Sequence, residues 1–425
     1  MEKEVSSVQE PKFNYGKLFL IGFGFFGTSV LWSLYNVYVP LLLSQRFGLD
    51  SVAIGFFMSI DNIAALFIQP PVGAWSDRVR TKLGRRLPFI LVGAPIAAVA
   101  FGLIPLAASL PVFVACTVTT ILAMAFWRTP VVALMPDVTP SHLRSQANGI
   151  INFMGGVGMV LGTSIGGILV KQNQAFPFWF GSALVILAAI LVLIFVREPK
   201  VPVEEVTKED PNMWKSLKDL FTGKHGDALR IFLAILFWFI AYNAIEAFLS
   251  LYGVNVLGLE LGDAGRLVTS VGATFLIFSI PAGFIGAKLG RRKTISIGLT
   301  IMILVLLAIF FIPQSTLLVQ HGTLPLLGNF YNLTILLLLA GIGWSFININ
   351  SLPMVVDLTT SAKTGTFTGL YYLFSTLAAI IGPNLNGLII KLAGGNYGAI
   401  FVIGPVFMLA ALAMIFGVRS GEARD

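Results

Sequence analysis

The stretch GAWSDRVRTKLGRRLP at Gly73–Pro88 is a short polar loop between two apolar segments. A shortened copy, GFIGAKLGRRK, occupies Gly283–Lys293, about half a chain later. A basic loop that recurs in this way indicates two related membrane bundles joined in series. Parallel repeats of this kind are typical of secondary transporters, in which the solute binds between the two halves.

Other residues repeat with the loop. Asp137 reappears as Asp357 and Gly162 as Gly382, both at an offset of 220 residues. Chance rarely produces the same offset at separate motifs. We therefore expect six helices plus six, related by a pseudo-two-fold axis along the membrane normal.

The composition predicts a polytopic membrane protein. The chain is 56% hydrophobic and 11% charged, whereas soluble domains carry about 25% charged residues. Its apolar runs are about 20 residues long, enough to cross a hydrocarbon core of roughly 30 Å. We expect an all-α fold with twelve transmembrane helices, at about 17–43, 51–73, 88–108, 111–136, 145–170, 176–196, 229–255, 264–287, 294–313, 329–355, 364–391 and 397–418.

These spans define three parts of the chain. Residues 1–196 form an N-terminal six-helix bundle and residues 229–425 a C-terminal one. Residues 197–228 form a linker on the cytoplasmic side. Within it, the apolar residues of NMWKSLKDLFTG recur at helical spacing, which predicts a short amphipathic helix on the membrane surface.

The basic residues indicate the orientation in the membrane. Most of the 28 Lys and Arg fall in the even-numbered inter-span loops and the two tails. Such residues accumulate on the cytoplasmic side, so we expect a cell-membrane protein with both termini cytoplasmic. The net charge of +8 comes with no nucleic-acid motif, and the lipid bilayer is the expected partner. The first residues, MEKEVSSVQEPK, contain no apolar signal segment.

Three motifs resemble a known family: QPPVGAWSDR at 69–78, GRRLPFI at 84–90 and RTPVVALMPD at 128–137. Together with the repeated loop and the 6+6 layout, they resemble the Major Facilitator Superfamily. Within it they are similar to the sucrose–proton symporters and the wider glycoside–cation symporters. The resemblance implies a monomer that works by alternating access, with spans one, four, seven and ten lining a central cavity.

The resemblance also implies a conformational latch between the bundles in the outward-facing state. An alternative is that these are solvated charges which only set topology. The second loop copy has Ala287 where Asp77 aligns, so the latch is expected in the first half only. Its expected members are Gly73, Asp77, Arg78, Gly84, Arg85 and Arg86.

Ionisable residues inside the membrane are costly and are candidates for ion coupling. Asp61 and Glu246 lie deepest, and each can carry a proton, bind Na⁺, pair with Arg128 or remain a neutral structural carboxyl. The resemblance implies that Asp137 takes part in proton coupling, with Arg266 as its salt-bridge partner. A structural role for Asp137 as a helix-end cap is the alternative.

Sugar recognition needs aromatic faces for the C–H surface of the ring and amides for the hydroxyls. Aromatic residues also gather at membrane interfaces, whereas an amide inside an apolar span is expensive to bury without a partner. The expected substrate-binding residues are Tyr35, Asn36, Trp127, Tyr242, Asn243, Trp344, Asn348 and Tyr371.

We therefore expect a symporter, coupled to H⁺ or Na⁺, that carries a glycoside such as a di- or oligosaccharide. One alternative is a proton-coupled exporter of hydrophobic drugs, and another is a membrane sensor that transports nothing. The chain has no HExxH, GxxxxGK[ST] or GxSxG motif. We accordingly expect no enzyme activity, no cofactor and no metal site.

Overall fold

The computed structural model describes residues 15–138, 144–198, 226–358 and 364–418. In this part of the chain twelve helices are long and apolar enough to cross a membrane, as the sequence predicts. Continuous helices suit these apolar runs because lipid offers no partners for backbone N–H and C=O groups. The amphipathic helix expected in the linker lies outside the described residues.

The elements follow the repeat. The first six spans are α1 (Tyr15–Gln45), α2 (Ser51–Phe57) with α3 (Ile60–Arg78), α4 (Leu87–Leu103), α5 (Leu110–Val138), α6 (Arg144–Leu169) and α7 (Phe176–Phe195). The second six are α9 (Gly226–Asn255), α10 (Leu261–Leu289), α11 (Arg291–Phe311), α13 (Asn332–Val356), α14 (Thr364–Leu392) and α15 (Ile400–Phe416). The short elements are η1 (Ile104–Leu106), α12 (Gln314–Leu317), β1 (Gln320–Leu324), β2 (Gly328–Tyr331) and η4 (Tyr397–Ala399).

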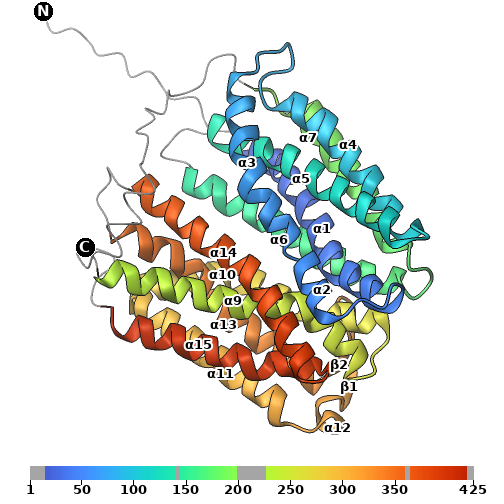
Figure 1. The fold of residues 1–425 in the computed structure, drawn as a ribbon. Helices are drawn as coiled ribbons and strands as arrows, with labels where there is room; N and C mark the ends of the chain where they lie inside the picture. Colours follow the sequence, from blue (N-terminus) through green and yellow to red (C-terminus); the bar gives the residue numbers. More distant parts are fainter. Residues whose placement is uncertain (1–14, 139–143, 199–225, 359–363, 419–425) are drawn as a thin grey trace, which may run out of the picture.

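The helices form two bundles that lie side by side (Figure 1). In the first, α1 packs on α6 and α7, and α4 packs on α5 and α7. In the second, α13 packs on α10 and α11, and α9 packs on α14 and α15. The core of each bundle holds a fully buried tryptophan, Trp127 in the first and Trp238 in the second.

The second span is broken, although the sequence predicts one continuous helix there. Asp50 accepts a hydrogen bond from the backbone N–H of Ala53 (2.9 Å) and caps the start of α2. The α-helix stops at Phe57 and resumes as α3 at Ile60. Asp61 therefore lies in the first turn of α3, where the positive end of the helix dipole favours a carboxylate.

The bundles meet at the helix ends opposite the termini, which we call the outer end. There α2 packs on α14 and α6 on α10. The Ser51 hydroxyl donates to the backbone oxygen of Gly387 (2.7 Å), and the Asn384 amide donates to the Ser59 hydroxyl (2.9 Å). A Cβ on Gly55 would lie 2.3 Å from the backbone oxygen of Pro383. The outer end is therefore closed by close backbone contact.

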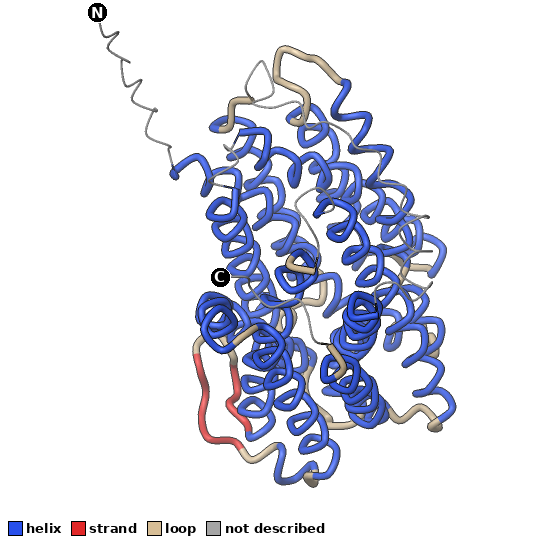
Figure 2. Tube along the Cα trace, turned by 90° about the vertical axis from the view of Figure 1, so that its left-hand side faces the viewer, coloured by secondary structure: helices blue, strands red, loops and turns tan. Residues whose placement is uncertain are grey.

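A two-stranded antiparallel hairpin connects α12 to α13 at the outer end, and no strand is expected there from the sequence. Gln320 pairs with Tyr331, and Leu324 pairs with Gly328 at the turn. Figure 2 shows the two strands at one end of the second bundle. All of β1 is exposed, whereas Gly328 at the start of β2 is buried.

Candidate functional site

Three ionisable side chains from both bundles meet in the membrane-spanning part of the molecule. Asp61 of α3 interacts electrostatically with Arg128 of α5 and with Glu246 of α9. Arg128 is exposed, and Asp61 and Glu246 are partly exposed. Asp61 and Arg128 belong to the first bundle and Glu246 to the second, so the interaction of Asp61 with Glu246 spans the two halves. We call these three residues the charge group.

The charge group is joined to α1. The Asn36 amide donates a hydrogen bond to Glu246 Oε1 (3.3 Å) across the bundle interface. Tyr35 is fully buried and lies in the electrostatic field of Asp61. Its hydroxyl has no hydrogen-bond partner within the described part of the chain. Tyr35 and Asn36, both expected to bind solute, thus lie beside the charge group, but in this conformation only Asn36 is partly exposed and Tyr35 offers a solute no surface.

Aromatic side chains of the second bundle lie next to Glu246. The Tyr242 and Trp344 rings stack with centroids 3.8 Å apart and an interplanar angle of 4°. Tyr242 also lies in the electrostatic field of Glu246. The Tyr371 hydroxyl is 3.0 Å from that of Ser351. Three of the expected aromatic residues are thus grouped on one bundle.

Asn243 and Asn348, the two amides expected to bind solute in the second bundle, are both partly exposed and contact their own helices. The Asn243 side chain donates to the backbone oxygen of Phe239, in its own helix (2.7 Å). Asn348 accepts at its backbone oxygen from Ser351 (2.7 Å). Both residues are partly exposed, so each retains polar surface that can contact a solute.

Trp127 is not exposed beside the charge group, although the sequence predicts that it binds solute. Its side chain is fully buried in the first bundle, and its Nε1–H donates to the sulfur of Met124 (3.1 Å). It packs against the glycine positions Gly27 and Gly93. Trp127 is a core residue because its face of α5 points toward α1 and α4.

Asp137 is paired within its own bundle, not with Arg266. It accepts hydrogen bonds from Arg85 Nε (3.1 Å) and from Arg86 Nε (2.9 Å). The Arg86 guanidinium also donates to the hydroxyl of Ser76. Four side chains from α3, α5 and the loop before α4 therefore form one cluster at the end of the bundle that bears the termini.

The loop expected to form the latch is held by Glu198, which the sequence motifs do not include. The Glu198 carboxylate accepts three backbone N–H bonds, from Arg85, Arg86 and Leu87, at 2.7 to 2.8 Å. Gly84 has φ +115°, and a Cβ there would lie 2.5 Å from the Glu198 carboxyl carbon. An acid directly after span six is the signal in the sequence that could have revealed this contact.

In this conformation the expected latch residues therefore bind their own bundle. A Cβ on Gly73 would lie 3.5 Å from the Thr129 methyl carbon, an ordinary contact distance, and Arg78 is exposed at the end of α3. The side chain of Asp77 lies outside the described residues. The second bundle repeats the pairing, because Arg291 binds Asp357.

Arg266 lies at the outer end and does not bind Asp137, the salt-bridge partner that the resemblance implies for it. Its side chain is next to Asp263, with Nη1 3.5 Å from Oδ1. Asp263 also faces Lys171 of the first bundle, with the Lys171 ammonium 3.3 Å away. Arg266 thus belongs to a contact between the bundles and not to the charge group.

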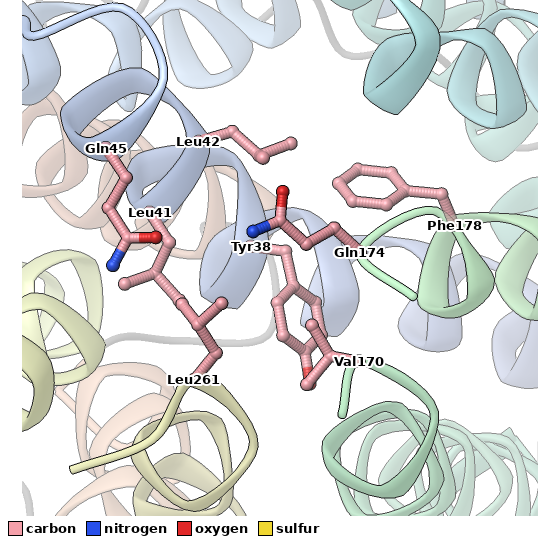
Figure 3. A pocket seen from close by; sticks show the side chains of 8 residues that line it. All are labelled: Tyr38, Leu41, Leu42, Gln45, Val170, Gln174, Phe178 and Leu261. Atoms are coloured by element: carbon pink, nitrogen blue, oxygen red, sulfur yellow. The ribbon is translucent and has the colours of Figure 1, made fainter. Parts of the chain in front are cut away.

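A small pocket opens at the outer end of the first bundle. Figure 3 shows its lining side chains, which come from α1, the α6–α7 connection, α7 and, through Leu261, α10. Its polar groups are the amides of Gln45 and Gln174 and the hydroxyl of Tyr38. It is separate from the charge group. The expected absence of a cofactor stays a prediction.

Comparison with known proteins identifies the family. The model of the Major Facilitator Superfamily matches residues 21–319 and 262–425. Multidrug resistance protein 1 of Bacillus subtilis (strain 168) is 26% identical over 230 residues, 54% of this chain and 56% of that protein. Quinolone resistance protein NorA of Staphylococcus aureus (strain MRSA252) is 25% identical over 268 residues, 63% of this chain and 64% of that protein. The alignments thus span less than two thirds of these relatives.

Solved structures share the whole fold at low identity. A bacterial homolog of the human lysosomal transporter Spinster, in an inward-facing and occupied conformation, has a TM-score of 0.71 and 17% identity. The match covers 96% of this chain and 97% of that one. The nucleoside transporter NupG has a TM-score of 0.74 and 13% identity, over 94% of this chain and 99% of its own. The chain is a multi-pass membrane protein that belongs to the Major Facilitator Superfamily of transporters.

Proposed function

We propose that the chain is a cation-coupled symporter of a polar, hydroxylated solute of the sugar or glycoside class, driven by a proton or sodium gradient. The observation that carries the proposal is the charge group, in which Asp61 interacts with Arg128 of its own bundle and with Glu246 of the other. Ionisable side chains at membrane depth are costly and mark ion and solute pathways.

The hydrogen bond from Asn36 to Glu246 supports a coupling role for Glu246. A cation that binds this carboxylate competes with the Asn36 amide for the same oxygen. Occupancy at Glu246 therefore changes a contact between the halves, and with it the balance of conformations. An ion drives transport only through such a difference in affinity between two conformations.

The aromatic group supports a ring-shaped, hydroxylated solute. Tyr242 is partly exposed next to Glu246, and its ring stacks on the buried ring of Trp344. Asn243 and Asn348 are partly exposed on the same two helices, α9 and α13. A sugar ring offers a C–H face to such an aromatic surface and hydroxyls to carboxylates and amides.

A second candidate is proton-coupled export of lipophilic drugs, which the names of the Bacillus and Staphylococcus relatives favour. Two carboxylates suit a cationic drug, but the exposed Arg128 interacts with one of them, Asp61. Like charges repel, so Arg128 weighs against a cationic cargo. The same guanidinium can donate up to five hydrogen bonds to solute hydroxyls.

Uptake into proteoliposomes tests the proposal. With labelled glucosides outside the vesicles and an imposed proton or sodium gradient, we expect accumulation under one of the two. Glu246→Gln should abolish it, and the matched control Asp227→Asn, which changes an acid outside the charge group, should not. Accumulation under neither gradient contradicts symport. Gradient-driven extrusion of ethidium in its place supports the exporter, and ligand binding without flux supports a sensor.

A further inference from the structure

The outer end carries a second cluster of charges, centred on Asp263 in the first turn of α10. Asp263 is 8% exposed. Three donors from three segments reach its carboxylate: Lys171 at 3.3 Å, Arg266 at 3.5 Å and the Asn329 amide at 3.0 Å. Lys171 also pairs with Glu260 (3.1 Å). We call these five residues the outer gate.

The outer gate joins the two bundles. Lys171 follows α6 in the first bundle, whereas Asp263 and Arg266 belong to α10 in the second. The backbones also touch, because a Cβ on Gly262 would lie 2.3 Å from the backbone oxygen of Gly167. Solute can reach the charge group from the outer end only when these contacts separate.

The β1–β2 hairpin touches the gate at two points. Asn329 of β2 donates its amide to Asp263 Oδ2. One residue earlier, Gly328 leaves space for Arg266, since a Cβ there would lie 2.4 Å from Arg266 Nη1. On its other side Arg266 packs against Gly167, whose Cβ would lie 2.8 Å from Arg266 Nε. The Arg266 side chain is thus held between the hairpin and the first bundle.

From this arrangement we propose that the β1–β2 hairpin regulates opening of the outer gate. Asn329 is a positioning residue that holds the Asp263 carboxylate where Lys171 of the opposite bundle can bind it. Arg266 transmits the position of the hairpin to Gly167. Loss of the Asn329 amide leaves Asp263 with two cationic partners and no neutral one, so its carboxylate is free to turn away from Lys171.

Thiol labelling tests this proposal without a transport assay. Ser250 is fully buried, and its hydroxyl donates to the backbone oxygen of Val37 across the bundle interface (3.3 Å). It lies five residues from the outer end of α9. With Cys116, the single cysteine, replaced by alanine, a cysteine substituted at Ser250 reacts with a soluble maleimide only when the outer end opens.

We expect Asn329→Ala to raise the labelling rate about ten-fold, the effect of losing one hydrogen bond to a charged group. Asn396→Ala is the matched control, because that outer-end side chain binds the backbone N–H of Gly398 (2.8 Å) and touches neither the hairpin nor the gate. Asn329→Asp, which keeps the shape, removes the donor and places a second negative charge beside Asp263, should raise the rate at least as much. It also serves if the alanine variant folds poorly.

A double-mutant cycle gives the decisive comparison. Lys171→Met should also speed labelling, and combining it with Asn329→Ala should add little, because both act through Asp263. An unchanged rate in Asn329→Ala and Asn329→Asp, or fully additive effects in the double variant, overturns the proposal. Neither result bears on the solute, so this inference and the proposed symport can fail independently.

Discussion

Asn36 and Glu246 lie on equivalent first helices of the two bundles, and the amide of one donates to the carboxylate of the other at 3.3 Å. We expect Asn36→Ala to uncouple ion movement from solute movement, because the cation then no longer displaces a contact between halves. Solute-free proton or sodium leak, measured with an ion-sensitive dye in proteoliposomes, should rise several-fold. A leak equal to that of the wild type contradicts this prediction.

Neutral variants of the charge group separate coupling from exchange. Asp61→Asn and Glu246→Gln should lose gradient-driven accumulation while keeping exchange of labelled for unlabelled solute, since exchange needs no net ion movement. Both are measured on the same vesicles. Accumulation at the level of the wild type in either variant removes that residue from the coupling mechanism.

The two tryptophans should respond differently to truncation. Trp344→Ala breaks the stack with Tyr242 and should raise the half-saturation concentration about five-fold, as for a lost aromatic contact of about 1 kcal/mol beyond area burial. Trp127→Ala leaves a cavity in the core and should cost about 3–5 kcal/mol of stability. Solute titration and thermal unfolding in detergent give the two readings. A large affinity loss in Trp127→Ala, at unchanged stability, is the contrary outcome.

The repeated ion pairs should differ in strength. The Asp137 side chain is 12% exposed and binds two arginines, whereas Asp357 is 28% exposed. We expect Asp137→Asn to cost about 3 kcal/mol, because it removes the charge of the carboxylate that binds both guanidinium groups. Asp357→Asn should cost about 1 kcal/mol. Equal shifts in thermal midpoint would argue against this ranking.

The outer ion pairs should not contribute to pH dependence near neutrality. The hydrogen bond from Lys391 holds the pKa of the Asp50 carboxyl below its ordinary value. That pair therefore strengthens closure at pH values above the ordinary aspartate pKa of about 3.9 and is lost as the pH falls through the lowered pKa. Its contribution is constant at neutral pH.

Lys171 is also expected to keep a constant charge near neutral pH, because its pKa lies in the basic range and is raised further. Partial burial lowers the pKa of its ammonium, but the hydrogen bond to Glu260 and the charge of Asp263 outweigh burial and raise it. Its contribution is complete below the ordinary lysine pKa of about 10.4 and is lost as the pH rises through the raised value. The variant Asp50→Asn/Lys171→Met should keep the shape of the wild-type pH profile of transport. A shift in the midpoint of the pH profile of transport in this variant contradicts the prediction.

Much of the architecture follows from the sequence, because an apolar run of sufficient length has only one stable form in lipid. The repeat likewise predicts that Asp137 and Asp357 occupy equivalent helix ends, but not that they bind Arg85 and Arg291. Which partner a charged side chain binds depends on how segments far apart along the chain pack together. Helical periodicity within one span contains no such information.

The same limit applies to the aromatic residues. Trp127 and Trp344 both lie in apolar spans, and only packing places the first in the core and the second beside Tyr242. The break before Asp61 also escapes sequence analysis, because the run 51–73 contains no proline until Pro70. The hairpin has neither a long apolar run nor a strong alternation to predict it.

The interruption of the second span at Met58–Ser59 places a joint between two helices, α2 and α3, directly beside an acid. Ser51 and Gly55, before the joint, are tied to α14 by backbone contacts, whereas Asp61, after it, faces Arg128. When the halves rock apart, the second span can bend at this joint and α2 can follow the opposite bundle for part of the stroke. A change of charge on Asp61 thus acts within one helical turn of that joint.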